Sequence, residues 1–303
     1  MRIFVAGATG VLGNRTVLRL LAAGHDVTGV ARSEAKAAAL IAVGARPARV
    51  DLFDAAGLVN GVAAHEVVMN LATHIPPLSK ASRPGAWAEN DRIRTEGSRN
   101  LVDAAIKAGA RRYVQESIAL FYADHGDVLV DEDSAVEPPP ASAAFLDAEA
   151  QAQRFTDAGG IGVALRFGNF YASDSHHTEG MLKLARMGVS PFPGSRDEYF
   201  PVIHADDAAD AVLAAVEAPA GLYNVAAPAE TKGEAADALA RLLGRKKLRF
   251  APRAVQAAGG AGARALMRSV RVSSERFRQA TGWEPTYPTA EAGYAEVLRT
   301  SRP

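Results

Sequence analysis

Apolar residues cluster along the chain in short runs, separated by longer segments with helical periodicity. The first run covers residues 3–6, and an amphipathic helix with apolar positions every three to four residues begins near residue 11. This alternation predicts an α/β fold whose strands form a doubly wound parallel sheet with helices on both faces. Later strands are expected over 26–32, 49–53, 66–72, 112–117, 163–167 and 222–225.

The segments between these strands carry the helical pattern and the residues that start helices. Ser33 is expected to cap a helix over 33–43, and Asp206 or Asp207 to cap a helix that starts near 204. A loop with several prolines is expected over 73–85. The other helices are expected over 55–62, 87–108, 142–158, 178–188, 232–243 and 252–267.

The first strand runs directly into Gly7, Gly10 and Gly13, and the first helix follows at once. In such a unit one glycine permits the tight turn, the next lets the main chain approach a pyrophosphate, and the third lets the helix pack on the strand. The helix N-terminus then faces the phosphates with free N–H groups and a partial positive charge. The motif predicts a dinucleotide-binding Rossmann domain over 1–166 plus about 199–226, with a smaller, mixed C-terminal substrate lobe over about 167–198 plus 227–303.

The end of the second strand is expected to face the adenosine ribose, where an acid favours NAD(H) and a base accommodates the 2′-phosphate of NADP(H). Arg32 and Ser33 stand there, with Lys36 one turn further on, so NADP(H) is favoured over NAD(H). A solvated Arg32 at a helix start is the alternative. Asp51 is expected to bind the adenine amino group or else to cap a loop, and Leu52 to pack on the adenine ring.

Composition narrows the class of protein further. Lys and Arg total 34 and Asp and Glu total 34, so the formal net charge of +0 gives no reason to expect nucleic acid or a membrane as a partner. The chain has no cysteine, which excludes disulfides and thiolate chemistry and is compatible with the cytoplasm. The first strand starts at the N-terminus and no apolar run approaches the ~20 residues of a membrane span, so a cytoplasmic location is expected.

Short segments along essentially the whole chain resemble, in the same order, the extended short-chain dehydrogenases/reductases, the nucleotide-sugar epimerases and dehydratases. The resemblance rests on Gly7–Gly13, Asp51–Leu52, Asn70–Ala72, Glu96–Ala105, Arg112–Val114, Leu165–Tyr171, Val202–Ala209, Tyr223–Val225 and Thr281–Pro285. It implies binding of a nicotinamide coenzyme. The implied cofactor-binding residues are Gly7, Thr9, Gly10, Val11, Leu12, Gly13, Arg32, Ser33, Asp51, Leu52, Leu71, Ala72, Thr73, Phe167, Gly168 and Phe170.

The resemblance fails at the catalytic residues. In the family a Tyr-x-x-x-Lys pair and a Ser or Thr carry the reaction, and the Lys lowers the pKa of a phenol that is about 10 in isolation. The register puts Phe145 and Glu149 at the Tyr and Lys positions and Ile118 at the Ser position, one residue after Ser117. No tyrosine of the chain is followed by Lys four residues later. The chain thus resembles atypical members that keep the cofactor fold and replace the catalytic set.

Other polar groups are expected near the cleft. Ser117 and Tyr122 are the candidate catalytic hydroxyls, with strand capping and packing as the alternative. Asp147 and Glu149 are expected to be solvated helix acids, or else buried carboxyls with a raised pKa. The adjacent His176 and His177 have no third ligand placed by spacing, so no metal is expected. The substrate-binding candidates are His74, Asn169, His176 and Tyr199.

Three functions stay open. The first is an NADP(H)-preferring, epimerase/dehydratase-like oxidoreductase of the atypical short-chain dehydrogenase type, with a non-standard proton donor and a small-molecule substrate. The second is a non-catalytic NADP(H)-binding sensor or regulatory protein. The third is a redox-neutral isomerase or cyclase that keeps the nucleotide as structure. The helices over 87–108 and 142–158 would permit a homodimer, and the basic segment 245–249 is expected to be solvated.

Overall fold

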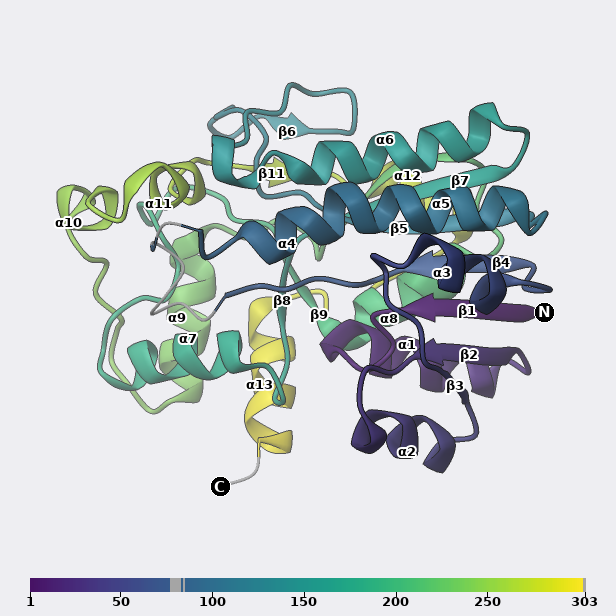
Figure 1. The fold of residues 1–303 in the computed structure, drawn as a ribbon. Coiled ribbons are helices and arrows are strands. Elements are labelled where there is room, and N and C mark those ends of the chain that lie inside the picture. Colours follow the sequence, from purple (N-terminus) through teal and green to yellow (C-terminus); the bar gives the residue numbers. More distant parts are fainter. Residues whose placement is uncertain (77–82, 84, 302–303) are drawn as a thin grey trace.

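The computed structural model describes residues 1–76, 83 and 85–301. Within these residues seven parallel strands form one sheet in the order β10-β7-β5-β4-β1-β2-β3. Figure 1 shows helices on both faces of this sheet, which confirms the predicted doubly wound α/β fold. The strands are β1 (Arg2–Ala6), β2 (Asp26–Val30), β3 (Arg46–Ala48), β4 (Val67–Asn70), β5 (Arg112–Ile118), β7 (Ile161–Phe167) and β10 (Gly221–Val225).

Each face of the sheet has its own hydrophobic core. One core joins β1 and β4 to the apolar sides of α1, α2 and α8, and the other joins the sheet to α3, α5 and α6. Burial of both faces explains why the strand sequences are almost continuously apolar. These helices are α1 (Val11–Ala22), α2 (Glu34–Ala42), α3 (Ala55–Val62), α5 (Ser98–Lys107), α6 (Ala144–Asp157) and α8 (Ala205–Ala214).

The third strand lies earlier in the chain than predicted. The expected strand over 49–53 is wrong, because β3 covers Arg46–Ala48 and residues 49–53 have already left the sheet. Pro47 pairs with Gly29 at the outer edge of the sheet, where a residue without an N–H group is tolerated. An edge strand this short and polar gives no apolar run for a sequence pattern to detect.

The long helix predicted over 87–108 contains an irregular turn. It begins as α4 (Ala88–Arg92), passes through a π-helical turn (Ile93–Gly97) and continues as α5. A π-helical turn shifts the face that the following residues present, and such turns are frequent at functional sites. The loop predicted over 73–85 falls partly outside the described residues, which include only 73–76, 83 and 85 of it.

The C-terminal lobe has a separate core beyond the carboxyl ends of the strands (Figure 1). Its centre is a stacked pair of rings, Tyr171 and Tyr294, with centroids 4.7 Å apart. Helices α7, α9 and α13 surround this pair. The elements beyond the main sheet are β6 (Leu129–Val130), β8 (Asn169–Tyr171), β9 (Val202–His204), β11 (Arg271–Val272), a 3-10 turn (Pro140–Ser142), α7 (His176–Arg186), α9 (Lys232–Leu242), α10 (Arg253–Ala257), α11 (Gly260–Leu266), α12 (Glu275–Thr281) and α13 (Ala290–Thr300).

Two helices differ from their predictions, one in its middle and the other at its N-terminus. The helix expected over 252–267 is two helices, α10 and α11, interrupted at Ala258 and Gly259, and Gly260 at the start of α11 has φ +88°. Helix α8 is capped by His204, whose side chain accepts from the N–H of Asp206, so the predicted Asp caps are wrong. Asp207 is used elsewhere: its carboxylate accepts from the N–H groups of residues 286 and 287.

The segment between α11 and α13 completes the core of the sheet rather than that of the lobe. Phe277 on α12 and the following Trp283 belong to the same buried cluster as Ile3 and Val5 of β1. The Trp283 indole also donates to the Asp207 carbonyl at 3.1 Å. In the described part of the chain, no helix combines the length and apolar character needed to cross a membrane.

Candidate functional site

The glycine turn between β1 and α1 leaves no room for side chains at two of its three glycines. Gly7 has φ +80°, and a Cβ there would lie 2.5 Å from the main chain of Leu71. A Cβ at Gly13 would lie 2.0 Å from the Gly7 carbonyl oxygen. Gly10 is exposed, and a Cβ there would meet only that carbonyl oxygen, at 3.4 Å. The turn is thus closed on the protein side and open at Gly10.

The N-terminus of α1 fits an anionic group. Gly10 is the N-cap and, among the described residues, no side chain caps the first turn. The first N–H groups of a helix have no partner within the helix, and the helix dipole favours negative charge at this end. The pyrophosphate of a dinucleotide supplies both the acceptors and the charge. Gly10 and the amides of Val11 and Leu12 would hold it.

The residues predicted to meet the adenosine end follow β2 and β3, two paired strands of the sheet. Arg32 and Ser33 are exposed just after β2, and Ser33 caps α2 by accepting from the N–H of Lys36 at 3.4 Å. Asp51 accepts from the N–H of Phe53 at 2.9 Å, so its predicted alternative as a loop cap is present. Its side chain remains exposed, and nothing in this contact prevents the second oxygen from meeting a ligand.

The residues predicted near the nicotinamide are partly used by the core. Phe167 is fully buried within the sheet core, and the half-buried Phe170 packs on it with ring centroids 5.2 Å apart. A Cβ at Gly168 would lie 3.0 Å from the main chain of Pro201 and Val202, so the close approach of that segment already requires this glycine. At the end of β4, Leu71 is buried, Ala72 is half-buried and Thr73 is exposed.

Five side chains form a closed polar network at the carboxyl ends of three neighbouring strands. Ser117 on β5 and Asn224 on β10 stand in register on either side of Arg166 on β7. Arg166 donates twice to the Glu149 carboxylate, each time at 2.7 Å, and Ser117 donates to the same carboxylate at 2.5 Å. Arg166 also donates to the Tyr122 hydroxyl at 2.8 Å, which in turn donates to Asn224 at 2.7 Å.

The network is buried and its charges are matched. The side chains of Arg166 and Glu149 are 5% and 11% exposed, so the expectation that Glu149 is a solvated acid is wrong, whereas Asp147 is exposed as expected. Burial opposes the charge of Arg166, but the hydrogen bonds and charge of Glu149 raise its pKa above the usual value. Burial raises the pKa of Tyr122 despite the neighbouring guanidinium, so Tyr122 stays neutral.

Neither predicted catalytic hydroxyl points its proton toward open space. Ser117 and Tyr122 are both fully buried, and each hydroxyl donates to an acceptor inside the protein. Phe145, one helical turn before Glu149 on α6, is also buried. The position that the family resemblance assigns to an ammonium therefore holds a carboxylate that is tied to a guanidinium.

A second buried ion pair lies beside the network. Arg94, on the π-helical turn, donates to both carboxylate oxygens of Glu116 at 3.0 and 2.8 Å, and both side chains are less than 5% exposed. Burial raises the pKa of Glu116, and Arg94 opposes this rise. Sequence reasoning missed Arg94 and Arg166. The signal for Arg166 was its position inside an apolar strand, because a buried charge requires a partner.

The four predicted substrate-binding residues are spread over the lobe boundary. His74 is exposed and its N–H donates to Asn90 at 3.1 Å, while Asn169 lies half-buried on β8. His176 is fully exposed at the first turn of α7, with Glu179 at 3.7 Å. Among the described residues, no hydrogen bond or ion pair joins these side chains to one another. They also contain no group of three or more His, Asp or Glu arranged to hold a metal ion.

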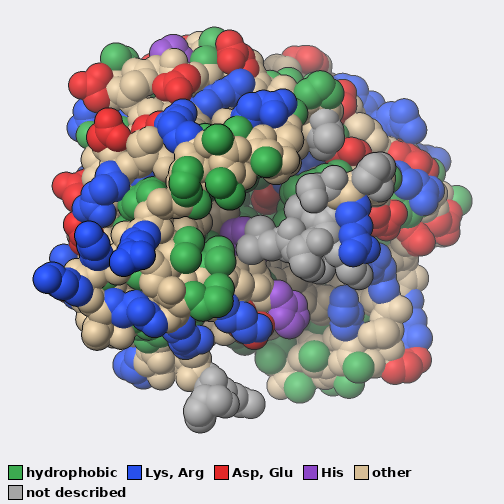
Figure 2. Space-filling view, turned by 90° about the vertical axis from the view of Figure 1, so that its left-hand side faces the viewer, with side chains coloured by type: hydrophobic (Ala, Val, Ile, Leu, Met, Phe, Trp, Pro, Cys, Tyr) green, Lys and Arg blue, Asp and Glu red, His purple; other side chains and the backbone are tan. Residues whose placement is uncertain are grey.

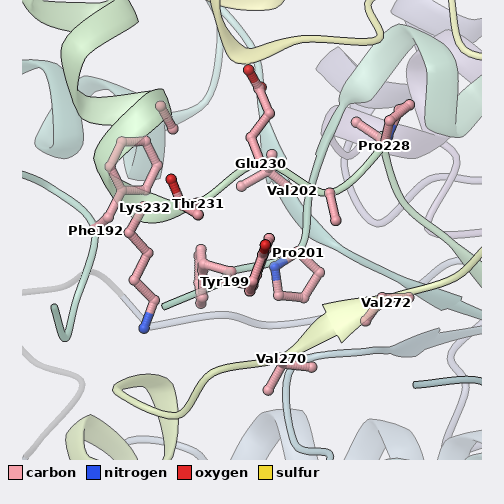
Figure 3. A pocket seen from close by; sticks show the side chains of 14 residues that line it. Phe192, Tyr199, Pro201, Val202, Pro228, Glu230, Thr231, Lys232, Val270 and Val272 are labelled. Carbon is pink, nitrogen blue, oxygen red and sulfur yellow. The ribbon is translucent and has the colours of Figure 1, made fainter. Parts of the chain in front are cut away.

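Tyr199 lines a small cavity inside the C-terminal lobe (Figure 3). In this view Tyr199 and Pro201 lie between Lys232 and the pair Val270 and Val272. The fully buried Lys232 ammonium donates to Glu198 at 2.9 Å and to two main-chain carbonyls. The cavity has a volume of about 10 Å³, enough for one water molecule and too small for a substrate.

The open space lies elsewhere, on the face toward which the parallel strands run. Figure 2 shows that this face is hollowed near its centre, with hydrophobic and histidine side chains around the depression. Ligands of doubly wound folds bind beyond the carboxyl ends of the strands. The glycine turn and the network of Ser117, Glu149 and Arg166 both belong to that end of the sheet.

Comparison with known proteins agrees with this geometry. The chain is 34% identical to a 3-diazoavenalumate denitrifying reductase from a Streptomyces species, over 97% of this chain and 99% of the relative. Its fold matches the crystal structure of the human epimerase family protein SDR39U1 with NADPH. The TM-score is 0.78 and the sequence identity 25%, over 99% of this chain and 100% of that chain. The UDP-glucose 4-epimerase of Thermotoga maritima with UDP-glucose shares the fold, with a TM-score of 0.80 and 20% identity over 99% and 98% of the two chains.

The family assignment rests on the sequence together with the fold. The family model of the NAD dependent epimerase/dehydratase family matches residues 3–226, which include the glycine turn and every strand of the main sheet. The resemblance to the extended short-chain dehydrogenases/reductases is thereby confirmed. The chain belongs to the NAD dependent epimerase/dehydratase family.

Proposed function

We propose that the protein is an NADP(H)-linked reductase whose substrate is reduced at the carboxyl ends of β5, β7 and β10. The family membership, the reductase that is 34% identical over nearly the full length, and the human structure with NADPH support this proposal. The bound coenzyme would supply a hydride. The protein would hold its pyrophosphate at Gly10 and the first turn of α1, and its 2′-phosphate near Arg32 and Ser33, which are exposed after β2.

The observation that carries the proposal is the closed network around Arg166. Reduction of a ketone leaves an alkoxide that must receive a proton, and a positioned side chain normally gives it. Here the Ser117 proton is directed to Glu149 and the Tyr122 proton to Asn224. We therefore propose that the substrate is an electrophile whose reduction requires no proton from a side chain.

An arenediazonium group is such an electrophile, and the Streptomyces relative is named for a diazo compound and for denitrifying reduction. When an arenediazonium ion accepts a hydride, a C–H bond forms, the C–N bond breaks, and its electron pair leaves with N2. The diazonium carbon is reduced, NADPH is oxidised to NADP+, and no proton is consumed. The chain's own side chains then need only to bind, orient and keep water away from the reacting carbon.

The test follows hydrogen from its source into the product. Purified full-length protein is given 4-carboxybenzenediazonium and NADPH carrying deuterium at C4 of the nicotinamide, and the product is analysed by mass spectrometry. We expect NADPH consumption, N2 release and deuterium in the product, with no deuterium incorporated from D2O when unlabelled NADPH is used. Reactions without protein and with Gly13→Ala, which cannot form the glycine turn, correct for spontaneous decomposition.

Each other outcome identifies a different function. A sensor would be favoured if calorimetry showed binding of NADPH but no NADPH was consumed with diazonium ions, aryl ketones or UDP-glucose. Substrate conversion with deuterium arriving only from solvent would favour a redox-neutral isomerase or cyclase. Faster reduction of ketones than of the diazonium ion would contradict the absence of a side-chain proton donor.

A further inference from the structure

An apolar wall adjoins the network at the end of β5. Its members come from three separate segments and are apolar without exception. Phe121, Phe145 and Ala265 are buried, and their neighbours in the wall are only half-buried. The apolar wall consists of Ile118, Leu120, Phe121, Phe145, Leu146, Ala265 and Leu266.

The apolar wall and the network share their backbone supports. Ile118 directly follows Ser117 on β5, and Phe145 stands one helical turn before Glu149 on α6. Residues four apart on a helix lie on the same face, so the wall continues that face beyond the carboxylate. The rings of Phe121, in the segment that follows β5, and Phe145 on α6 pack against each other with centroids 6.2 Å apart. The apolar wall and the network therefore lie side by side at the ends of β5 and α6.

Helix α11 closes the wall from the other lobe. Its sequence Gly-Ala-Gly-Ala-Arg-Ala-Leu brings one large apolar side chain, Leu266, and its buried Ala265 packs against the cluster of Phe121 and Phe145. Leu266 remains half-buried, as do Ile118 and Leu146. These three half-buried side chains have apolar surface still to be covered, and they belong to different segments that meet at one place.

We infer that the apolar wall receives an apolar, aromatic part of the substrate and excludes sugars. This inference rests on the proposed function for the position of the site, and it names the substrate class. Sugar hydroxyls placed against the wall would lose hydrogen bonds to water without gaining partners, which costs free energy for each hydroxyl. An aromatic ring covers the exposed parts of Ile118, Leu146 and Leu266 and loses little solvation. The wall thus selects against the nucleotide sugars bound by structures with the same fold.

The experiment compares two ligands of equal charge, and UDP-glucose as a third ligand, by calorimetry with the protein saturated with NADP+. trans-Cinnamate is flat and apolar, whereas glucuronate has a polar ring of similar size. We expect cinnamate to bind and glucuronate and UDP-glucose to show no heat of binding. Leu266→Asn and Leu146→Asn should each weaken cinnamate binding about tenfold, as expected from loss of part of one buried Leu contact. Ile161→Asn is the control, since Ile161 is an exposed apolar residue at the opposite end of β7.

The outcomes separate this inference from the proposed function. Cinnamate binding that the two wall variants weaken supports the inference even if no NADPH is consumed. Absence of cinnamate binding, tight binding of UDP-glucose, or wall variants that behave like Ile161→Asn would each overturn it, even with an active reductase. Thermal unfolding followed by circular dichroism checks that the variants fold. If Leu266→Asn does not fold, cinnamate binding is compared in Leu146→Asn and in Leu266→Ala, which is a smaller change.

Discussion

Reversing the charge of Glu149 is the most direct test of the buried network around Arg166. In Glu149→Lys an ammonium would be placed against Arg166, whose side chain is only 5% exposed. The carboxylate that accepts three hydrogen bonds, two from Arg166 and one from Ser117, would be lost at the same time. Nothing else in the network carries a negative charge to replace it.

The expected cost follows from two contributions. Removing one partner of a buried ion pair leaves the other charge uncompensated and costs about 3–5 kcal/mol. Two positive charges roughly 4 Å apart repel by about 4 kcal/mol at an effective dielectric constant near 20. Side-chain relaxation lowers this second contribution, so we expect a loss of at least about 4 kcal/mol out of a total stability of roughly 5–15 kcal/mol.

The assay is thermal unfolding followed by circular dichroism. A loss of about 4 kcal/mol or more lowers the melting temperature by roughly 6 °C or more in a protein of this size, since the entropy of unfolding is about 2.1 cal/mol/K per residue. The control is Asp147→Lys, which reverses the charge of an exposed acid on the same helix. Asp147→Lys loses only a favourable interaction with the helix N-terminus and should melt within about 3 °C of the parent.

Adding Arg166→Met to Glu149→Lys removes the repulsion and should recover at least half of the loss in stability. A Glu149→Lys protein that melts as close to the parent as this control would refute the reasoning.

Three further predictions concern the nucleotide site and the lobe boundary. Gly7→Ala should abolish NADPH binding in calorimetry, because its Cβ would lie 2.5 Å from the Leu71 main chain, whereas Gly24→Ala, with φ +78° but open space, should cost only about 1 kcal/mol and keep binding. Arg32→Asp should shift the ratio of NADPH to NADH affinity toward NADH, and an unchanged ratio would remove Arg32 from the site. Burial lowers the pKa of His204 from the usual 6.5. The contribution of the neutral His204 side chain to stability is therefore present above pH 6.5 and is lost as the pH falls through the lower pKa of the folded protein. Melting at pH 7.5 and 5.5 should show this loss in the parent and a smaller one in His204→Asn, which keeps a capping acceptor; equal losses would contradict it.

The fold and the nucleotide turn could be read from the sequence because both depend on local patterns. Apolar runs, helical periodicity and the spacing of Gly7, Gly10 and Gly13 specify the sheet and its first turn without knowledge of distant contacts. Strand β3 could not be found in this way, because an edge strand containing Pro47 has no apolar run. The same holds for the π-helical turn, whose Arg94 pairs with Glu116 of β5, a residue 22 positions later in the chain.

The network could be predicted only in part. The family resemblance predicts that Glu149 stands at the Lys position, and this stays a prediction. The partner of Glu149 could not be predicted, because Glu149 and Arg166 come from α6 and β7 and meet only through tertiary packing. The charged residue inside the apolar strand over 163–167 was the available signal, since burial of a guanidinium demands an anion. The apolar wall depends on the position of α11, and no pattern in its Ala- and Gly-rich sequence indicates where that helix packs.

The packing of Phe277 and Trp283 into the sheet core has a consequence for how relatives can exchange parts. The family match ends at residue 226, yet the core of the sheet contains side chains from a segment well beyond it. A chimera that grafts the lobe of one relative onto the sheet of another must therefore leave residues 275–287 with their own sheet. The interior of the lobe, including α9 and α11, can then diversify toward new substrates while this late segment keeps the nucleotide half intact.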